Sequence, residues 1–181
     1  MPKIVTSKEE IIEQSRRLFL QHGYYATSIA MLSEACGIQK AHFYYYFKSK
    51  EDLMRSVLKA TNVYFQNEVY LKTIESDFPS NEILNELLSK IEEKYSKMGG
   101  CIIGNTILET SSQGVFKHEL STFINDLSEV LTELYYLKLN DLDMAKTKSI
   151  ATIQDIQGGL MMMRLNNEVS HLQKAIERAK K

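Results

Sequence analysis

Apolar side chains recur every three or four positions through most of this chain, which is the spacing of one buried face of an α-helix. No segment alternates apolar and polar residues as a half-buried strand does. Only 2 Pro and 8 Gly interrupt the 181 residues, which favours long helices. We therefore expect an all-α fold. Helices are predicted over residues 7–23, 28–36, 40–46, 49–71, 82–98, 101–111, 115–139, 142–165 and 168–179, with a loop at 75–81.

Two short predicted helices near the N-terminus are separated by a tight turn. The helix before them starts at Ser7 with a capping box, because a Glu follows three residues later. The helices over 28–36 and 40–46 come next, with Gly37 between them. Two helices of about two turns joined by a turn that contains Gly are typical of a helix-turn-helix. We predict a helix-turn-helix domain over residues 1–48 and a second helical domain over residues 49–181.

The second of these short helices carries side chains suited to contact with DNA bases. In a helix-turn-helix, the N-terminal part of the second helix meets base edges in the major groove. Gln39, Lys40 and His42 supply hydrogen-bonding groups at that place. Ala41 is small enough to approach a thymine methyl group. The segment therefore predicts sequence-specific DNA binding.

Three consecutive tyrosines follow these residues. Tyr44, Tyr45 and Tyr46 cannot share one helical face, so some of their hydroxyls point outward and can donate to phosphate oxygens. The alternative is an exposed aromatic patch with no contact to DNA. Lys50 starts the next predicted helix, whose N-terminus itself attracts phosphate.

The charge of the chain is unevenly distributed, which bears on this prediction. The whole sequence has 22 basic and 23 acidic side chains, a net charge of −1. Residues 1–60 hold nine basic and six acidic side chains and are +3, so the remainder is −4. A near-neutral average therefore conceals a basic N-terminal part, which is compatible with DNA, and an acidic remainder.

The same N-terminal part resembles the TetR family of bacterial one-component regulators. That family typically shows G-V-S-K-G-T-L-Y-H-Y-F and then K-S-K-E-D-L, where this chain has G-I-Q-K-A-H-F-Y-Y-Y-F and then K-S-K-E-D-L at residues 37–53. Residues 19–29 also resemble the junction of the family's first two helices, and the resemblance extends over residues 7–60. It implies base contacts from Lys40, Ala41 and His42 and phosphate contacts from Ser28, Tyr44, Tyr46 and Lys50.

Departures from the family pattern fall on the positions that face DNA. Gln39 stands where Ser is common, Ala41 where Gly is common, and His42 where Ser or Thr is common. Tyr45 replaces a frequent His. The predicted fold is unaffected, but the operator sequence stays open. We keep Gln39 and Tyr45 among the candidate DNA-binding residues.

The TetR resemblance also implies a homodimer formed by the last two long helices. Both carry apolar residues at three- and four-residue spacing, and the second contains Gly158-Gly159, which permits close helix approach. The alternative is that these positions all form core within one chain. The candidate dimer residues are Leu120, Leu127, Leu131, Leu134, Ile153, Gly158 and Leu160.

In that family the middle helices enclose a small-molecule effector. The segment G-G-C-I-I-G-N at residues 99–105 resembles the G-C-[LI]-[LIV]-x-N start of helix six in a subset of TetR-like regulators. A helix N-terminus favours thiolate, so Cys101 is a candidate sensor of electrophiles or oxidants, or else a small buried hydrophobe. Asn105 and Thr106 line the site or bond helix to helix, and Met161 lines it or packs in the core. The candidate effector-binding residues are Tyr64, Met98, Cys101, Asn105, Thr106, Phe123 and Met161.

These features together predict a transcriptional regulator, a repressor released from a palindromic DNA operator by a small-molecule effector. One alternative is a small helical enzyme using Cys101 and His118, for which no G-x-S-x-G, H-E-x-x-H or phosphate loop is present. The other is a non-specific architectural DNA-binding protein, which the acidic second part disfavours.

No cofactor and no metal site are expected, because the four His show no metal-ligand spacing. Two Cys do not make a disulfide framework. The chain has no apolar run of about 18 residues and no signal-peptide pattern. We therefore expect no membrane segment and a cytoplasmic location.

Overall fold

The fold is all-α, as predicted. The structure, a computed structural model, describes residues 7–76, 79 and 82–181, and it holds no strand among them. The helices are α1 (Lys8–His22), α2 (Ile29–Cys36), α3 (Lys40–Tyr46), α4 (Lys50–Tyr64), the π-helix η1 (Phe65–Leu71), α5 (Lys72–Ile74), α6 (Ile83–Met98), α7 (Ile102–Thr110), α8 (Lys117–Leu139), α9 (Leu142–Asn166) and α10 (Ser170–Lys180). None of these described helices has the length and apolar character needed to cross a bilayer.

The helices group into two compact units. The first comprises the chain up to Asn62 together with Ile102–Leu120, and the second comprises Val63–Cys101 together with Ser121–Lys181. The predicted domain boundary at residues 48 and 49 therefore falls inside the first unit. That unit also contains α7, because α1 packs against α7. Sequence order alone assigns α7 to the second domain.

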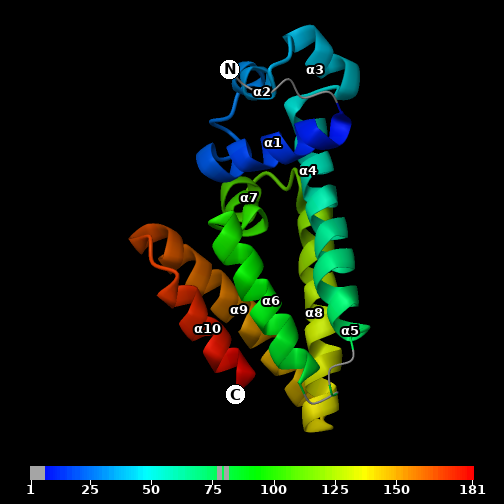
Figure 1. Cartoon of the computed structure of the whole chain (residues 1–181), viewed down its shortest axis with the longest axis vertical. Helices are drawn as coiled ribbons and strands as arrows, with labels where there is room; N and C mark the ends of the chain where they lie inside the picture. The colour runs from blue at the N-terminus through cyan, green and yellow to red at the C-terminus, as the bar shows by residue number, and fades with distance from the viewer. Residues whose placement is uncertain (1–6, 77–78, 80–81) are drawn as a thin grey trace. The chain divides into compact units, whose positions relative to one another are not determined.

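The core of the first unit is built where α1, α2 and α3 meet (Figure 1). Phe19 on α1, Leu32 on α2 and Phe43 on α3 are at most 1% exposed. Cys36 is fully buried beside them, and burial raises the pKa of its thiol to about 11. Cys36 therefore acts as a small apolar core residue.

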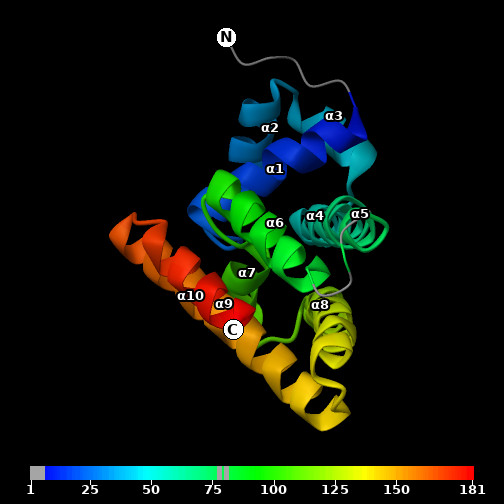
Figure 2. The same ribbon diagram turned by 60° about the horizontal axis from the view of Figure 1, so that its bottom comes forward.

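The second unit includes the antiparallel pair α9 and α10, which lie side by side in Figures 1 and 2. Their contact buries Leu172, Ala175 and Ile176 of α10. Tyr135 of α8 is also buried, with its hydroxyl 2.7 Å from the hydroxyl of Thr152 and 2.7 Å from the carbonyl of Ala179. These bonds tie α8 to α9 and to the end of α10.

The local start and stop signals behave as the sequence predicts. The Ser7 hydroxyl accepts from the Glu10 amide at 3.1 Å, and the Glu10 carboxylate accepts from the Ser7 amide at 3.2 Å, which confirms the capping box. Gly37 ends α2 with φ of 65°. This left-handed conformation suits glycine and produces the tight turn into α3.

The fourth predicted helix contains a π-helix that its sequence does not signal. Helical structure continues from α4 through η1 and α5. Hydrogen bonds in a π-helix join residues five apart, so residues five apart come to lie on the same side. Phe65 and Tyr70 are both 1% exposed, and their ring centroids are 6.0 Å apart. The π-helix therefore turns Tyr70 into the core.

The break before the last helix differs from its prediction. Asn166 and Asn167, just before the helix predicted over 168–179, end α9, where Asn167 has φ of 56°, and α10 begins at Ser170. The predicted loop at 75–81 contains residues 77, 78, 80 and 81, which lie outside the described residues, as do residues 1–6.

The two adjacent glycines of α9 provide a matched pair for testing the α9–α10 contact. A Cβ at Gly159 would lie 3.0 Å from the Ala175 Cβ and 3.1 Å from both the His171 carbonyl oxygen and the Leu172 Cα, whereas a Cβ at Gly158 meets nothing within 4 Å. We expect Gly159→Ala to lower the free energy of unfolding by about 1–3 kcal/mol relative to Gly158→Ala. Urea unfolding of the two variants measures this difference, and equal stabilities would contradict the close contact.

Candidate functional site

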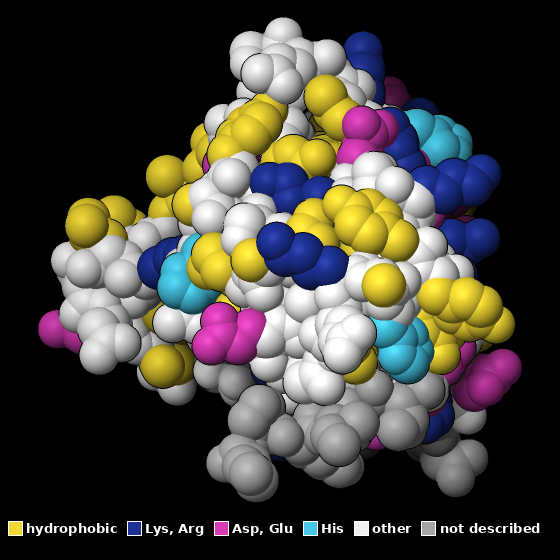
Figure 3. Space-filling model, turned by 90° about the horizontal axis from the view of Figure 1, so that it is seen from above, with side chains coloured by type: hydrophobic (Ala, Val, Ile, Leu, Met, Phe, Trp, Pro, Cys, Tyr) yellow, Lys and Arg dark blue, Asp and Glu magenta, His cyan; other side chains and the backbone are white. Residues whose placement is uncertain are grey.

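The first turn of α3 presents its side chains to solvent. Gln39, Lys40, Ala41 and His42 are all exposed, while Phe43 on the opposite side is fully buried. Seen from the end that carries α2 and α3, the surface shows Lys, Arg and His side chains interspersed with hydrophobic ones and a few acidic ones (Figure 3). The buried ring anchors the helix, so its polar residues are held outward and accessible.

The three tyrosines point in different directions. Tyr44 is 55% and Tyr45 is 81% exposed, whereas Tyr46 is half-buried. The His42 ring stacks on Tyr46 with centroids 5.4 Å apart and an interplanar angle of 18°. This stacking orients the imidazole of His42, and the two exposed tyrosines keep their hydroxyls on the surface.

Ser28 lies at the N-terminus of α2, where it has a structural bond and an exposed position. Its hydroxyl oxygen accepts from the Met31 amide at 3.2 Å, so it is the N-cap of α2. The hydroxyl proton is not used by that bond. Ser28 therefore can cap α2 and donate to a phosphate at the same time.

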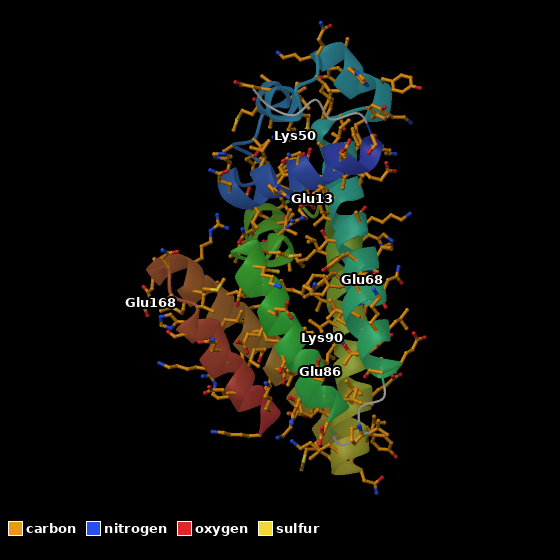
Figure 4. All side chains as sticks on the ribbon, in the orientation of Figure 1. Glu13, Lys50, Glu68, Glu86, Lys90 and Glu168 are labelled. Carbon is orange, nitrogen blue, oxygen red and sulfur yellow. The ribbon has the colours of Figure 1, made fainter. Side chains whose placement is uncertain are left out.

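Lys50 makes contacts inside the protein that its sequence position does not suggest. Its ammonium donates to the carbonyls of Tyr24 at 2.7 Å, Tyr25 at 3.3 Å and Thr27 at 2.8 Å. It also lies 4.5 Å from the centroid of the Tyr24 ring. Figure 4 labels Lys50, which reaches these residues from the start of α4. Burial lowers its pKa, which the nearby carboxylate of Glu109 opposes.

The same turn is held from α7. The carboxylate oxygen Oε2 of Glu109 accepts from the amides of Tyr24 at 2.8 Å and Tyr25 at 3.3 Å. The Tyr25 hydroxyl donates to Gln113 at 2.6 Å, and the Tyr24 ring meets Phe116 edge-on at 4.9 Å. Sequence reasoning assigned no role to Glu109, because more than 80 positions separate it from its partners.

An aromatic cluster lies in the second unit. The Phe65 ring is 5.4 Å from Tyr95 and 5.2 Å from Phe123, in addition to its contact with Tyr70. All four rings are at most 3% exposed. Phe123 is a predicted effector-binding residue, whereas Tyr70 and Tyr95 are not. The sequence gives no signal for the π-helix that buries Tyr70.

Polar groups border this aromatic cluster. The Cys101 thiol donates to the Tyr95 hydroxyl at 3.6 Å, and the Gln157 amide donates to the Cys101 sulfur at 3.8 Å. The Tyr70 hydroxyl is buried and has no hydrogen-bond partner among the described residues. Burial raises the pKa of Tyr70, and the nearby Asp126 adds to the effect, so this hydroxyl stays protonated. It is a buried donor that lacks an acceptor.

The other predicted effector-binding residues are dispersed. Met161 is 58% exposed, so it does not line the interior of this chain. Tyr64 lies under the ammonium of Lys94, 5.5 Å from its ring centroid, and Met98 is half-buried. Asn105 and Thr106 lie on α7 in the first unit, and the Thr106 hydroxyl donates to the Ile102 carbonyl of its own helix.

Most of the predicted dimer positions are buried within the single chain. Six of the seven predicted dimer residues are 9% exposed or less, namely Leu120, Leu127, Leu131, Leu134, Ile153 and Leu160. These side chains follow the alternative interpretation, a core inside one chain, because their own neighbouring helices cover them. Gly158 alone of the set is exposed. The large apolar residues that α9 leaves exposed are Leu142, Met144, Ile150, Met161, Met162 and Leu165, of which Ile150, Met161 and Leu165 share one face.

The exposed first turn of α3, held beside α2 by a glycine turn, defines a helix-turn-helix protein of the DNA-binding class. Residues 11–57 match the family described as "Bacterial regulatory proteins, tetR family". Over these residues the chain carries a TetR-type N-terminal DNA-binding domain. This match favours a transcriptional regulator over the alternative of a Cys/His enzyme.

Curated relatives match about half of the chain. One relative is the uncharacterized HTH-type transcriptional regulator YerO of Bacillus subtilis (strain 168), to which the chain is 40% identical over 91 residues. This match covers 49% of this chain and 31% of YerO. The chain is 29% identical over 94 residues to the biofilm operon icaADBC HTH-type negative transcriptional regulator IcaR of Staphylococcus aureus (strain Newman), which covers 50% of each. The matched part of the chain thus spans half or less of the length of each of these relatives.

Solved structures resemble the whole fold. A TetR transcriptional regulator from Legionella pneumophila superposes with a TM-score of 0.86 at 19% identity, covering 98% of this chain and 97% of that one. A TetR-family regulator from Agrobacterium tumefaciens gives 0.85 at 16% identity, covering 95% and 94%. At these identities the likeness concerns the fold.

The contrast between two buried tyrosines can be tested directly. We expect Tyr70→Phe to leave the free energy of unfolding unchanged or to raise it by up to about 1 kcal/mol, because the lost hydroxyl has no partner. Tyr135→Phe is the matched control and should cost about 1–2 kcal/mol, since its hydroxyl bonds two groups. Urea unfolding measures both. If Tyr70→Phe costs as much as Tyr135→Phe, the Tyr70 hydroxyl has a partner in solution.

Proposed function

We propose that this chain is a repressor that binds a palindromic DNA operator as a dimer and is released by a small-molecule effector. The observation that carries the proposal is the exposed first turn of α3, with Gln39, Lys40 and His42 outward and Phe43 buried behind them. Such a turn fits the major groove, where these side chains meet base edges. The word "negative" in the name of IcaR favours repression.

Contacts to the DNA backbone come from the surrounding hydroxyls. Tyr44 and Tyr45 expose theirs, and Ser28 retains a hydroxyl proton at the start of α2. Phosphate contacts fix the position of a protein on the duplex, while the base contacts from α3 discriminate between sequences. An assignment of phosphate contacts to Ser28, Tyr44 and Tyr45 therefore complements the base contacts of Lys40 and His42.

A dimer places two α3 helices on one operator. The exposed residues Ile150, Gly158, Met161 and Leu165 recur at intervals of three, four and eight along α9, so they share one face. This uncovered face, which is apolar apart from Gln154 and has a glycine in its middle, suits close packing against a second copy of the same helix. Two half-sites in successive major grooves would then lie about 34–36 Å apart.

The effector site is proposed at the aromatic cluster of the second unit. Tyr70 supplies a buried hydroxyl that needs an acceptor, and Cys101 and Gln157 add polar groups beside Tyr95. An unsatisfied buried hydroxyl costs about 1–3 kcal/mol, which a ligand recovers when it accepts a hydrogen bond from that hydroxyl. The effector class we propose is a small aromatic molecule with a carbonyl or similar acceptor, whose ring would meet these aromatic side chains while its acceptor meets the Tyr70 hydroxyl.

Operator binding is tested by gel shift with DNA from directly upstream of the coding sequence. We expect salt-sensitive binding to a palindrome there. Lys40→Ala should weaken binding by about tenfold and relax the preference for one sequence, because a base contact is lost. Lys174→Ala, an exposed lysine on α10, is the control and should bind as the unchanged chain does. Binding that shows no preferred site would favour an architectural protein instead.

Effector recognition is tested by thermal shift with pairs of ligands that differ in one acceptor. Acetophenones and the matching ethylbenzenes have similar shape, but only the ketones can accept from Tyr70. We expect the ketones to raise the melting temperature of the unchanged chain more than the hydrocarbons do. Tyr70→Phe should abolish the difference within each pair. If ketones and hydrocarbons stabilise the unchanged chain equally, Tyr70 does not select the effector.

A further inference from the structure

The turn at residues 23–27, between α1 and α2, obtains its hydrogen bonds from side chains. It lies outside both helices, so most of its polar groups have no partner in regular secondary structure. The Lys50 ammonium donates to the carbonyls of Tyr24, Tyr25 and Thr27. The Glu109 carboxylate accepts from the amides of Tyr24 and Tyr25. A cation from α4 and an anion from α7 therefore hold the same short segment.

The ammonium of Lys50 is already engaged by these contacts. An ammonium has three protons to donate, and three carbonyls lie within 3.3 Å of it. A phosphate contact would require Lys50 to leave at least one carbonyl without its donor. Thr27, whose carbonyl it holds, directly precedes Ser28, the cap of α2. The position of Lys50 thus sets where α2 begins.

Gly23 shows how closely the carboxylate of Glu109 approaches the turn. A Cβ at position 23 would lie 2.4 Å from the Glu109 Oε1 atom and 2.9 Å from its Cδ atom. Gly23 also has φ of +84°, which other residues adopt at a cost. No side chain larger than hydrogen fits at this position while Glu109 keeps its place.

We propose that Glu109 and Lys50 are positioning residues for DNA binding, which fix the turn at residues 23–27 and make operator affinity depend on the position of α7. Lys50 acts through the turn and not as a phosphate ligand. Because α7 begins directly after Cys101 in the chain, a displacement of α7 is passed through Glu109 to the start of α2. The dependence of operator affinity on α7 rests on the proposed DNA-binding function, whereas the contacts of Glu109 and Lys50 with the turn do not.

Amide hydrogen exchange tests the contacts without any DNA. In Glu109→Ala we expect the Tyr24 and Tyr25 amides to exchange at least about tenfold faster, since both lose their acceptor. Glu109→Gln keeps one acceptor oxygen and should show a smaller increase, which guards against misfolding of the alanine variant. Gln113→Ala removes only the bond to the Tyr25 hydroxyl and should leave both amides unchanged. Unchanged exchange in Glu109→Ala would overturn the proposal.

The salt dependence of DNA binding separates positioning from phosphate contact. The probe is a duplex enriched from a random pool by the unchanged chain. We expect Lys50→Ala and Glu109→Gln each to weaken binding about tenfold, with the slope of log affinity against log salt unaltered. A phosphate ligand would lower that slope by about 0.9 when removed. Such a loss in Lys50→Ala would overturn the assignment of Lys50.

The two readouts separate this inference from the proposed function. If the unchanged chain enriches no duplex, the DNA-binding proposal fails while the exchange result still tests the contacts of Glu109. If binding occurs but Glu109→Gln and Glu109→Ala bind as tightly as the unchanged chain, operator affinity does not depend on α7. The dependence of DNA binding on Glu109 is then overturned, whatever the exchange experiment shows.

Discussion

The backbone of the turn between α1 and α2 needs hydrogen-bond partners that neither helix provides, and the first unit is arranged around that need. A polar backbone group without a partner costs about as much as a lost hydrogen bond. Lys50 and Glu109 supply the partners from 23 to 85 positions further along the chain. Arg55 of α4 extends the arrangement, since it donates to the Val115 carbonyl at 2.6 Å and lies 5.3 Å from the Phe116 ring. α4, α7 and the start of α8 therefore support one short segment.

The position of α3 follows from the same support. Its seven residues are far fewer than the about 12 that an isolated helix needs in water, so packing must hold it. Phe43 and Phe47 provide that packing against the rest of the first unit. The exposed residues of the first turn consequently take their direction from α2 and from the turn before it. The proposed effect of Lys50 and Glu109 on DNA binding is therefore indirect, because both contact the turn and not the exposed residues of α3.

Sequence patterns predicted what depends on neighbouring residues and missed what depends on distant ones. The capping box at Ser7, the glycine turn at Gly37 and the bounds of α3 are local, and the structure confirms them. The partners of Lys50 lie 23–26 positions away, and nothing at its own position distinguishes a bond to a carbonyl from one to a phosphate. The family pattern favoured the phosphate. Tyr70 was missed for a related reason, because a π-helix changes which residues share a face.

The period of apolar residues shows that a helical face is buried but not which molecule covers it. The positions on α8 and α9 that fit the period best are covered by the chain itself, so six of the seven predicted dimer positions are buried within one chain. α9 also carries Ile150, Met161 and Leu165 on a face that the single chain leaves exposed. A helix with apolar residues on most of its sides is normally buried on most of its sides. The proposed dimer would cover this face of α9, because another copy of α9 supplies an apolar stripe of the same length and spacing.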